Sequence, residues 1–395
     1  MTTRPVASAA GPSTRSVHAT ESMDDPFGSV VAPIYANSAF AYPSVEAWRE
    51  AAEEQSGHIY TRNSNPTTDR FERKIAALEH AERATSFTTG MAAISSTLFT
   101  LLRPGRRVVS CPDLYGGSYL LLHRTLPEWG VVSTLVETDT AAVVDALSAG
   151  ADVVYLETPT NPTLKVLDIS AIAAAARRAG ALLVIDNTLA TPINQQPLTL
   201  GADLVLHSAS KFIGGHGDVL GGVIAGSAEL VGRIYAFREI AGTGMDPQVA
   251  AALLRSIKTL ALRVEKHNAS ALAIASWLTS QPAVDTVHYP GLADHPSYAV
   301  AAAQMRGFGG VLSFTLRGGE PAVRSALSRL RYAYLAANLG QVETIAGPPA
   351  TTSHVELTAQ ERARAGIPET MIRYSVGIED VEDLRQDLEN ALTGL

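Results

Sequence analysis

The sequence of 395 residues contains one cysteine, Cys111, and that scarcity excludes several classes of site. A single cysteine cannot form an internal disulfide, and it argues against a metal site with cysteine ligands. The ten histidines show no spacing typical of metal ligands, so the sequence predicts no metal centre. Proteins without disulfides are typical of reducing compartments, and we expect this protein in the cytoplasm.

Long apolar runs are also missing. No stretch of the sequence approaches the length that a helix needs to cross a bilayer, so we expect no membrane span. Residues 1–28 are rich in Ser, Thr and Ala and lack the continuous apolar segment of a secretory signal. We interpret them as a flexible or partner-wrapping arm.

Positive charge is outnumbered by negative charge. The chain has 31 Lys and Arg residues against 39 Asp and Glu residues, a formal net charge of -8. Binding to nucleic acid depends on patches of Lys and Arg, so we expect no nucleic-acid partner. No G-x-G-x-x-G motif lies between a first strand and its helix, which argues against a dinucleotide-binding oxidoreductase.

Lysine is rare even among the basic residues, and one of the five, Lys211, stands in an unusual place. It follows the apolar run 203–207 and precedes the glycine-rich segment 212–222, so a short buried strand would deliver an amine into a glycine-rich loop. Desolvation lowers the pKa of an ammonium group, which makes the free amine available as nucleophile and base. The structural alternative is a lysine that extends from a strand end into solvent.

Neighbouring motifs offer the other parts of a pyridoxal phosphate site. This cofactor needs a lysine for its aldehyde, a carboxylate beside its ring nitrogen and an aromatic face over its ring. Asp186 ends an apolar run that reads as a buried parallel strand, and ligands bind at such strand ends. Tyr115, in a Tyr-Gly-Gly turn, offers the aromatic face. Taken singly, both motifs are commonly plain turns.

A candidate phosphate site lies where residues 88–91 lead into an apolar helical pattern. The backbone amides of Gly90 and Met91 would stand at the positive N-terminus of that helix. Ser208 and Ser210, which flank the strand end before Lys211, would add hydroxyl donors. A Thr-Gly pair before a helix is by itself more often a plain cap, so the phosphate prediction depends on the combination.

These motifs resemble those of the Cys/Met-metabolism family of pyridoxal-phosphate enzymes, and within it most of all the methionine γ-lyases. Cystathionine γ-lyase, cystathionine γ-synthase and O-acetylhomoserine sulfhydrylase are the close relatives. The similarity runs from about residue 33 to the C-terminus. Eight motifs in the order of the family carry it, beginning at His58, Thr89, Tyr115, Glu157, Asp186, His207, Leu339 and Ile372.

The resemblance implies an α/β fold of the aspartate-aminotransferase type, fold type I. A large domain with a mostly parallel seven-stranded sheet would carry the cofactor, and a smaller α/β domain would follow it. The expected division is an arm at 1–62 that contributes to the neighbouring subunit's site, a cofactor-binding domain at 63–256 and a C-terminal domain at 257–395. The assembly implied is a homo-oligomer, a dimer with shared sites that pairs into a tetramer.

Apolar runs and helical periodicity place individual elements within these domains. We predict strands at 108–111, 132–136, 153–156, 182–185 and 204–207, and in the smaller domain at 310–316 and 371–376. An amphipathic helix is predicted at 169–179, and one long helical pattern from 247 to 277 is expected to bridge the two domains.

The resemblance also assigns roles to residues. Lys211 would bond the cofactor aldehyde, Asp186 would pair with the ring nitrogen, and Tyr115 would stack on the ring and protonate the leaving group. Arg373 would bind the substrate α-carboxylate through a bidentate pair, which suits guanidinium geometry. The remaining contacts would be made to the cofactor by Gly90, Met91, Asn161, Thr188, Ser208 and Ser210, to the phosphate by Tyr60 and Arg62 of the neighbouring subunit, and to the substrate by Asn338.

The reaction implied is γ-elimination from a small sulfur amino acid, L-methionine or homocysteine, to 2-oxobutanoate, ammonia and a thiol. A cystathionine γ-lyase and the γ-replacement reactions of cystathionine γ-synthase and O-acetylhomoserine sulfhydrylase remain open alternatives. Cystathionine-using relatives carry a glutamate where this chain has Ala337, and a neutral wall suits a thioether without a distal charge. The chain departs from the methionine γ-lyases at Gly117, where they have cysteine, and at Asn338, where they have serine.

Overall fold

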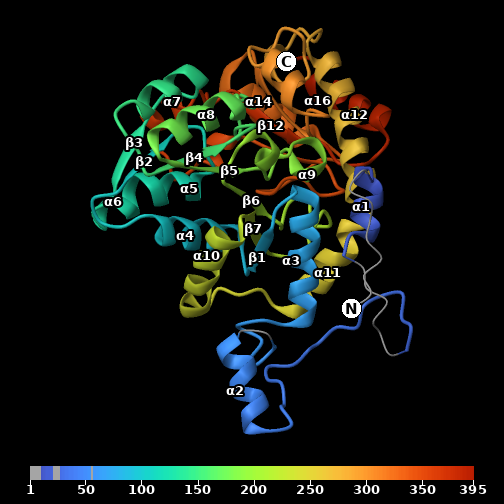
Figure 1. Cartoon of the computed structure of the whole chain (residues 1–395). Helices are drawn as coiled ribbons and strands as arrows, with labels where there is room; N and C mark the ends of the chain where they lie inside the picture. Colours follow the sequence, from blue (N-terminus) through green and yellow to red (C-terminus); the bar gives the residue numbers. More distant parts are fainter. Residues whose placement is uncertain (1–9, 21–26, 55–56) are drawn as a thin grey trace.

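The computed structural model describes residues 10–20, 27–54 and 57–395. The chain folds around two sheets, with a larger layered unit first and a smaller one after it (Figure 1). Parts of the predicted arm, residues 1–9, 21–26 and 55–56, lie outside the described residues. The boundaries at 62 and 256 stay predictions.

The larger sheet has seven strands in the order β1-β7-β6-β5-β4-β2-β3. The strands are β1 (Arg83–Phe87), β2 (Arg107–Ser110), β3 (Val132–Leu135), β4 (Val153–Glu157), β5 (Leu182–Asp186), β6 (Leu204–Ser208) and β7 (Gly222–Gly226). All neighbours from β6 to β3 pair in parallel, whereas β7 is antiparallel to both β1 and β6. The mostly parallel seven-stranded sheet is therefore confirmed.

Helices cover both faces of this sheet, because its central strands are apolar on both sides. On one face α3 and α11 pack against β6 and β7, and α8 packs against β4 and β5. On the other face α4 and α10 pack against residues such as Leu204 and Leu206 of β6. These helices are α3 (Pro66–Glu79), α4 (Gly90–Leu101), α8 (Ile169–Ala179), α10 (Ala228–Ala241) and α11 (Pro247–Ile257).

The smaller sheet has the order β10-β11-β12-β9-β8. Its strands are β8 (Val284–His288), β9 (Val311–Leu316), β10 (Tyr334–Leu335), β11 (Ile345–Gly347) and β12 (Met371–Ser375). Residues of α12 (Leu260–Leu278), α14 (Gly319–Arg329) and α16 (Val381–Leu392) form one apolar core with it. The sheet matters for function because β12 carries Arg373.

Shorter elements complete the chain. They are α1 (Pro12–His18), α2 (Val45–Glu54), α5 (Gly116–Leu120), the π-helical turn η1 (Leu121–Thr125), α6 (Leu126–Glu128), α7 (Thr140–Leu147), α9 (Thr191–Asn194), the 3-10 turns η2 (Pro197–Leu200) and η3 (Pro349–Thr351), α13 (Tyr298–Gln304) and α15 (Ala359–Arg364). Helix α1 packs on α3 and α12, whereas α2 stands away from the body of the molecule (Figure 1). Among the described helices, none combines the length and apolar character of a membrane span.

The predicted elements are largely confirmed. All seven predicted strands lie within one residue of β2, β3, β4, β5, β6, β9 and β12, and the predicted helix at 169–179 coincides with α8. The continuous helix expected from 247 to 277 was wrong, because Lys258 and Thr259 separate α11 from α12. Side chains end α11 at that point: Thr259 Oγ1 and Arg263 Nη2 both donate to the carbonyl of Ser256, at 3.1 and 3.0 Å.

Candidate active site

A cavity of about 600 Å³ opens where β4, β5 and β6 end and β12 of the smaller sheet approaches. This is the edge at which parallel sheets bind ligands. The cavity brings together eleven of the thirteen predicted site residues, which are Gly90, Met91, Tyr115, Asn161, Asp186, Thr188, Ser208, Ser210, Lys211, Asn338 and Arg373.

Lys211 stands in the turn that follows β6, and its amine reaches into the cavity. The Nζ atom donates a hydrogen bond to Asn338 Oδ1 at 2.5 Å. Burial, with a further contribution from the positive charge of Arg373, lowers the pKa of Lys211 to about 8. The amine is thus far closer to its nucleophilic, neutral form at physiological pH than an exposed lysine would be.

The loop after Lys211 is held by a buried guanidinium. Arg263 donates to the carbonyls of Phe212 and Ile213, at 2.7 and 3.4 Å. Gly215 has a φ of +68°, and a side chain there would overlap the Arg263 guanidinium. Glycine is required at 215 both by the left-handed backbone and by this contact.

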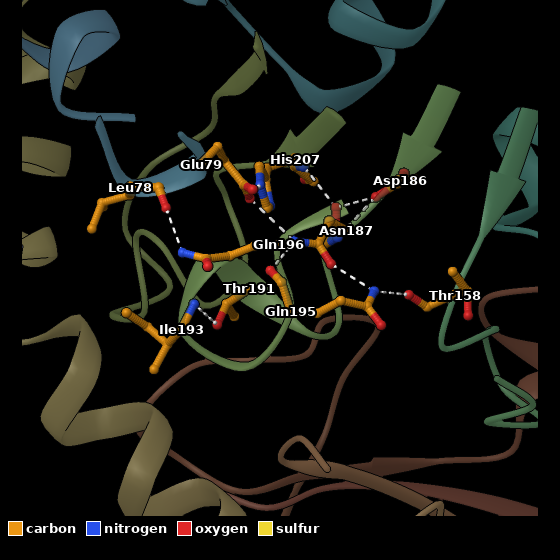
Figure 2. Close-up of polar contacts among 12 residues, drawn as sticks. Leu78, Glu79, Thr158, Asp186, Asn187, Thr191, Ile193, Gln195, Gln196 and His207 are labelled. Carbon is orange, nitrogen blue, oxygen red and sulfur yellow. Dashed lines mark hydrogen bonds and ion pairs between the residues drawn. The ribbon is translucent and has the colours of Figure 1, made fainter. Parts of the chain in front are cut away.

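Asp186 is the last residue of β5 (Figure 2), and Thr188, two positions later in the chain, holds its carboxylate. Its Oδ1 atom accepts hydrogen bonds from the backbone and hydroxyl of Thr188, at 3.0 and 2.5 Å. Tyr155 donates to the other oxygen at 3.4 Å. The pKa of Asp186 is raised by burial, which outweighs the opposing effect of the two Thr188 hydrogen bonds. The site thus offers an oriented carboxylate that can accept a hydrogen bond from a protonated ring nitrogen.

The start of α4 forms the candidate phosphate cradle. Thr89 caps the helix by accepting from Ala92 N at 3.0 Å, which leaves Gly90 and Met91 in the first turn at the cavity wall. A Cβ at Gly90 would lie 2.8 Å from the Cβ of Ser208, so only glycine lets α4 and the end of β6 approach this closely. Helix amides and serine hydroxyls are groups that bind phosphate.

Arg373 is the buried cation on the substrate side, with 6% of its surface exposed. Its guanidinium donates to Asn161 Oδ1 at 3.1 Å and to the carbonyl of Asn338 at 3.0 Å. Burial lowers the pKa of Arg373 to about 10, and the negative charge of Glu157 opposes that shift. The group stays protonated near neutral pH and is fixed in place to bind a carboxylate.

Tyr115 lies at the mouth of the cavity with 44% of its surface exposed, just before α5. Its backbone N–H donates to Glu157 Oε2 at 2.9 Å. A Cβ at Gly117 would lie 2.8 Å from the Tyr115 ring and 3.0 Å from Met91 Sδ. Glycine at 117, where the resemblance suggested cysteine, therefore leaves room for the position that the ring takes.

Two acidic residues of the cavity had no predicted role. Glu157 ends β4 in register with Asp186, and burial together with the charge of Asp186 raises its pKa well above the ordinary value. The sequence could have predicted Glu157 as a site residue, because it is a carboxylate at the end of a predicted strand, as Asp186 is. Glu356 lines the mouth from a loop without periodic pattern, and the sequence held no comparable signal for it.

Tyr60 and Arg62 lie outside this cavity. Arg62 donates to the carbonyl of Glu239 on α10 at 2.8 Å, and its guanidinium lies 5.6 Å from the Tyr60 ring centroid. Tyr60 is exposed. Their predicted contact with the phosphate of a neighbouring subunit stays a prediction.

Comparison with known proteins gives a consistent family. A family model described as Cys/Met metabolism PLP-dependent enzyme matches residues 13–393. The chain is 42% identical to L-methionine gamma-lyase of Pseudomonas putida over 386 residues, 97% of each chain. It is 40% identical to cystathionine gamma-lyase of Bacillus subtilis (strain 168), over 96% of this chain and 98% of that protein.

Solved structures agree with the sequence comparison. Cystathionine gamma synthase from Xanthomonas oryzae pv. oryzae, in complex with aminoacrylate and cysteine, superposes with a TM-score of 0.93 at 39% identity, over 97% of this chain and 98% of that one. Cystathionine gamma-lyase from Lactobacillus plantarum, complexed with L-serine, gives 0.90 at 38% identity, with the same coverage. The chain thus belongs to the Cys/Met-metabolism family and is a pyridoxal-phosphate-dependent enzyme of fold type I.

Proposed function

We propose that the protein catalyses γ-elimination from a sulfur amino acid, L-methionine or homocysteine, and releases 2-oxobutanoate, ammonia and the sulfur group, as a thiol from methionine or as hydrogen sulfide from homocysteine. The observation that carries the proposal is that Lys211, Tyr115 and Arg373 line one cavity. They would serve as base, acid and carboxylate-binding group, respectively. The neutral Ala337 lines the same cavity and supports a substrate whose sulfur substituent is uncharged.

Each side chain has a task that its surroundings suit. Arg373, fixed by Asn161 and Asn338, binds the α-carboxylate and places Cα near Lys211. Pyridoxal phosphate, when bound, supplies an electron sink for the negative charge that develops at Cα. Lys211 removes the α-proton, because its lowered pKa makes the neutral amine available near physiological pH. A second proton must then leave Cβ before the sulfur substituent can depart from Cγ. Tyr115, at the cavity mouth, protonates the departing sulfur.

The test compares four amino acids under identical conditions. Purified protein is incubated with methionine, homocysteine, cystathionine or O-acetylhomoserine, with and without an added thiol, and the products are identified by mass. We expect 2-oxobutanoate from methionine and homocysteine in the absence of thiol. A thioether that forms only after thiol is added, without any keto acid, would show that the enzyme performs γ-replacement instead.

A second substrate class is favoured by Glu356. Its Oε2 atom lies 3.1 Å from the position that a Cβ at Gly116 would take, so this carboxylate faces the Tyr115 turn at the cavity mouth. Within the described part of the chain, it has no hydrogen-bond or ion-pair partner. A carboxylate so placed suits a leaving group that carries an ammonium, as in cystathionine.

The Glu356→Gln variant tests whether substrates with an ammonium-bearing leaving group, such as cystathionine, are recognised differently from methionine. An exposed ion pair contributes little, so we expect KM for cystathionine to rise roughly two- to fivefold while KM for methionine stays constant. Glu229→Gln, on the surface of α10, removes a carboxylate far from the cavity residues and serves as the control. Equal KM changes for both substrates would remove Glu356 from substrate recognition.

The assembly and the location complete the proposal. We propose a cytoplasmic homo-oligomer in which two chains share sites and two such dimers form a tetramer. Exposed apolar side chains along the arm, among them Phe27, Val30 and Trp48, support burial against a second copy.

A further inference from the structure

Three consecutive hydrogen bonds lead from the amine of Lys211 out of the candidate active site. Lys211 Nζ donates to Asn338 Oδ1 at 2.5 Å. Asn338 Nδ2 donates to Gln341 Oε1 at 2.9 Å, and Gln341 Nε2 donates to Glu343 Oε2 at 3.0 Å. We call the side chains of Asn338, Gln341 and Glu343 the amide relay. Gln341 and Glu343 lie outside the cavity lining and have no role in the reaction described above.

The neighbouring backbone holds the relay against the loop that follows the lysine. The N–H of Val342 donates to the carbonyl of Gly215 in that loop at 2.9 Å. Gly217 of the same loop has a φ of +69°, and a Cβ there would lie 2.7 Å from Gln341 Oε1. A side chain at 217 would therefore displace the Gln341 amide from the place where it meets Asn338.

Glu343 fixes the direction of the bonds in the relay. An amide side chain has a donor end and an acceptor end of nearly equal shape, so its partners decide which way it faces. An ionised carboxylate only accepts, so the NH2 group of Gln341 faces Glu343 and its oxygen faces Asn338. The NH2 group of Asn338 is then occupied, and its oxygen is turned toward Lys211. Reversing both amides would place the Gln341 oxygen against the carboxylate, where neither atom can donate.

This direction matters most when Lys211 is neutral. An ammonium group has no lone pair and selects an acceptor by itself, whereas a neutral amine can donate or accept. With Asn338 reversed, its NH2 group would donate to the amine and occupy the lone pair that attacks an aldehyde or takes up a proton. With the Asn338 oxygen in place, the amine donates one N–H and its lone pair stays free.

We propose that Glu343 is a positioning residue that, through Gln341, holds the Asn338 oxygen toward Lys211 and so keeps the lone pair of the free amine available. The inference rests on the proposed role of Lys211 and adds two residues from outside the cavity to the site. Asn338 also accepts a hydrogen bond from Arg373 through its backbone carbonyl, at 3.0 Å. One residue thus contacts both the base and the carboxylate-binding group.

The test measures how the reaction of the apoprotein with pyridoxal phosphate depends on pH. Full-length apoprotein is mixed with a saturating concentration of pyridoxal phosphate, so that differences in affinity do not affect the measured rate. Stopped-flow absorbance then follows the bond-forming step. In the unaltered protein, this rate should level off above about pH 8, where the amine of Lys211 is neutral.

Glu343→Gln removes the directional preference, because the new amide can face Gln341 with either end. We expect the plateau rate to fall about two- to fivefold and the midpoint of the pH profile to fall by about half a pH unit. The midpoint falls because a reversed Asn338 stabilises the neutral amine and offers the ammonium form no acceptor, so the pKa of Lys211 decreases. An unchanged midpoint overturns the proposal, whether or not the plateau falls, because a loss of packing lowers the plateau alone.

Gln341→Leu separates the relay from the charge of Glu343. It breaks the connection, so we expect the same profile as for Glu343→Gln, and the double variant should show no further change. If Glu343→Gln does not fold, Gln341→Leu alone carries the test of the midpoint. A further fall of the midpoint in the double variant would show that the carboxylate acts directly through its charge, and would overturn the relay.

Asp380→Asn is the matched control for the loss of a carboxylate. Asp380 is exposed at the start of α16, and its side chain makes no cap hydrogen bond. It lies near the relay in the fold, because Ile378 N donates to the carbonyl of Val342 at 2.8 Å. Asp380→Asn should leave the pH profile unchanged. A midpoint shift equal to that of Glu343→Gln would contradict the proposal.

Lys211→Ala distinguishes a failure of this inference from a failure of the role on which it rests. If Lys211→Ala bonds the cofactor at the rate of the unaltered protein, the role of Lys211 itself is wrong. If Lys211→Ala forms no bond while Glu343→Gln and Gln341→Leu keep the unaltered midpoint, only the amide relay fails.

Discussion

At the scale of single residues, burial sets the chemistry of the cavity. The amine of Lys211 and the guanidinium of Arg373 share one cavity. Burial lowers the pKa of both groups, because the charged form loses contact with water. The effects differ in consequence. Lys211 gains a reactive neutral form near physiological pH, whereas Arg373 starts from so high a value that it remains a cation.

The pH dependence of cofactor bonding follows from Lys211. Its pKa is lowered from 10.5 to about 8, so the neutral fraction rises with pH and saturates above about 8. The rate at which apoprotein bonds pyridoxal phosphate should rise about tenfold per pH unit below that value and then level off. Stopped-flow absorbance measures this rate, and an increase that continues to about pH 10 would indicate an ordinary, solvated lysine.

Arg373→Lys tests the carboxylate clamp. An ammonium cannot form the two parallel hydrogen bonds that a guanidinium gives, so one charged hydrogen bond is lost. Such a bond contributes roughly 1.5–3 kcal/mol, and KM should rise about 10- to 100-fold with a smaller change in kcat. Steady-state kinetics provide the measurement, and Arg385→Lys on the surface of α16 is the control. An unchanged KM would assign the carboxylate to another residue.

At the scale of elements, the sequence predicted those whose pattern is complete in the local chain. The central strands are continuous apolar runs, and Asp168 and Gly180 mark the beginning and end of α8. Strands β1 and β7 were not predicted, because β1 has Thr85 and Ser86 at its centre and β7 begins and ends with glycine. The antiparallel pairing of these two strands, rather than their composition, makes them strands.

The candidate site shows the same division. Strand-end residues such as Asp186 and Lys211 could be predicted, because parallel strands bring their ends to one edge. Glu356 could not be predicted, because its place depends on a contact between distant segments. His354 Nε2 lies 3.0 Å from the carbonyl of Leu114, and this contact brings the loop with Glu356 beside the Tyr115 turn. The end of α11 depended likewise on the side chain of Arg263, from the next helix.

Gly222→Ala tests how closely β7 must approach α4. A Cβ at Gly222 would overlap the carbonyl of Thr89, immediately before the candidate phosphate cradle. The crowding should cost about 1–3 kcal/mol of unfolding free energy and also displace Gly90, so that pyridoxal phosphate binds more weakly. Thermal unfolding and cofactor titration measure the two effects.

The matched control lies at the other end of the same strand. A Cβ at Gly226 would lie 2.6 Å from the carbonyl of Asp203, and neither residue lines the cavity. Gly226→Ala should therefore destabilise the protein without weakening the cofactor. Similar losses of affinity in both variants would mean that general destabilisation, and not the Thr89 contact, is responsible.

At the scale of the whole molecule, one chain provides a cavity whose predicted phosphate ligands Tyr60 and Arg62 lie elsewhere. In a twofold dimer, both chains contribute the same surface to the interface, so each chain would complete the site of the other. The exposed apolar side chains of the arm are consistent with such an assembly.

Shared sites predict complementation between inactive variants. Arg62→Ala and Lys211→Ala should each lose most activity, but a dimer of one with the other contains one intact site. Co-expression in equal amounts should restore about a quarter of the unaltered activity, because half of the dimers are mixed and half of their sites are intact. Activity of the co-expressed mixture that does not exceed the mean of the two variants would contradict sharing.

The central claim, a covalent bond between pyridoxal phosphate and Lys211, is tested most directly by reducing the purified protein with borohydride and mapping its peptides by mass. We predict loss of the yellow absorbance and one phosphopyridoxyl group on the peptide that contains Lys211, with none on the other four lysines. A modification on another lysine, or no modification in protein that has been supplied with the cofactor, would contradict the account.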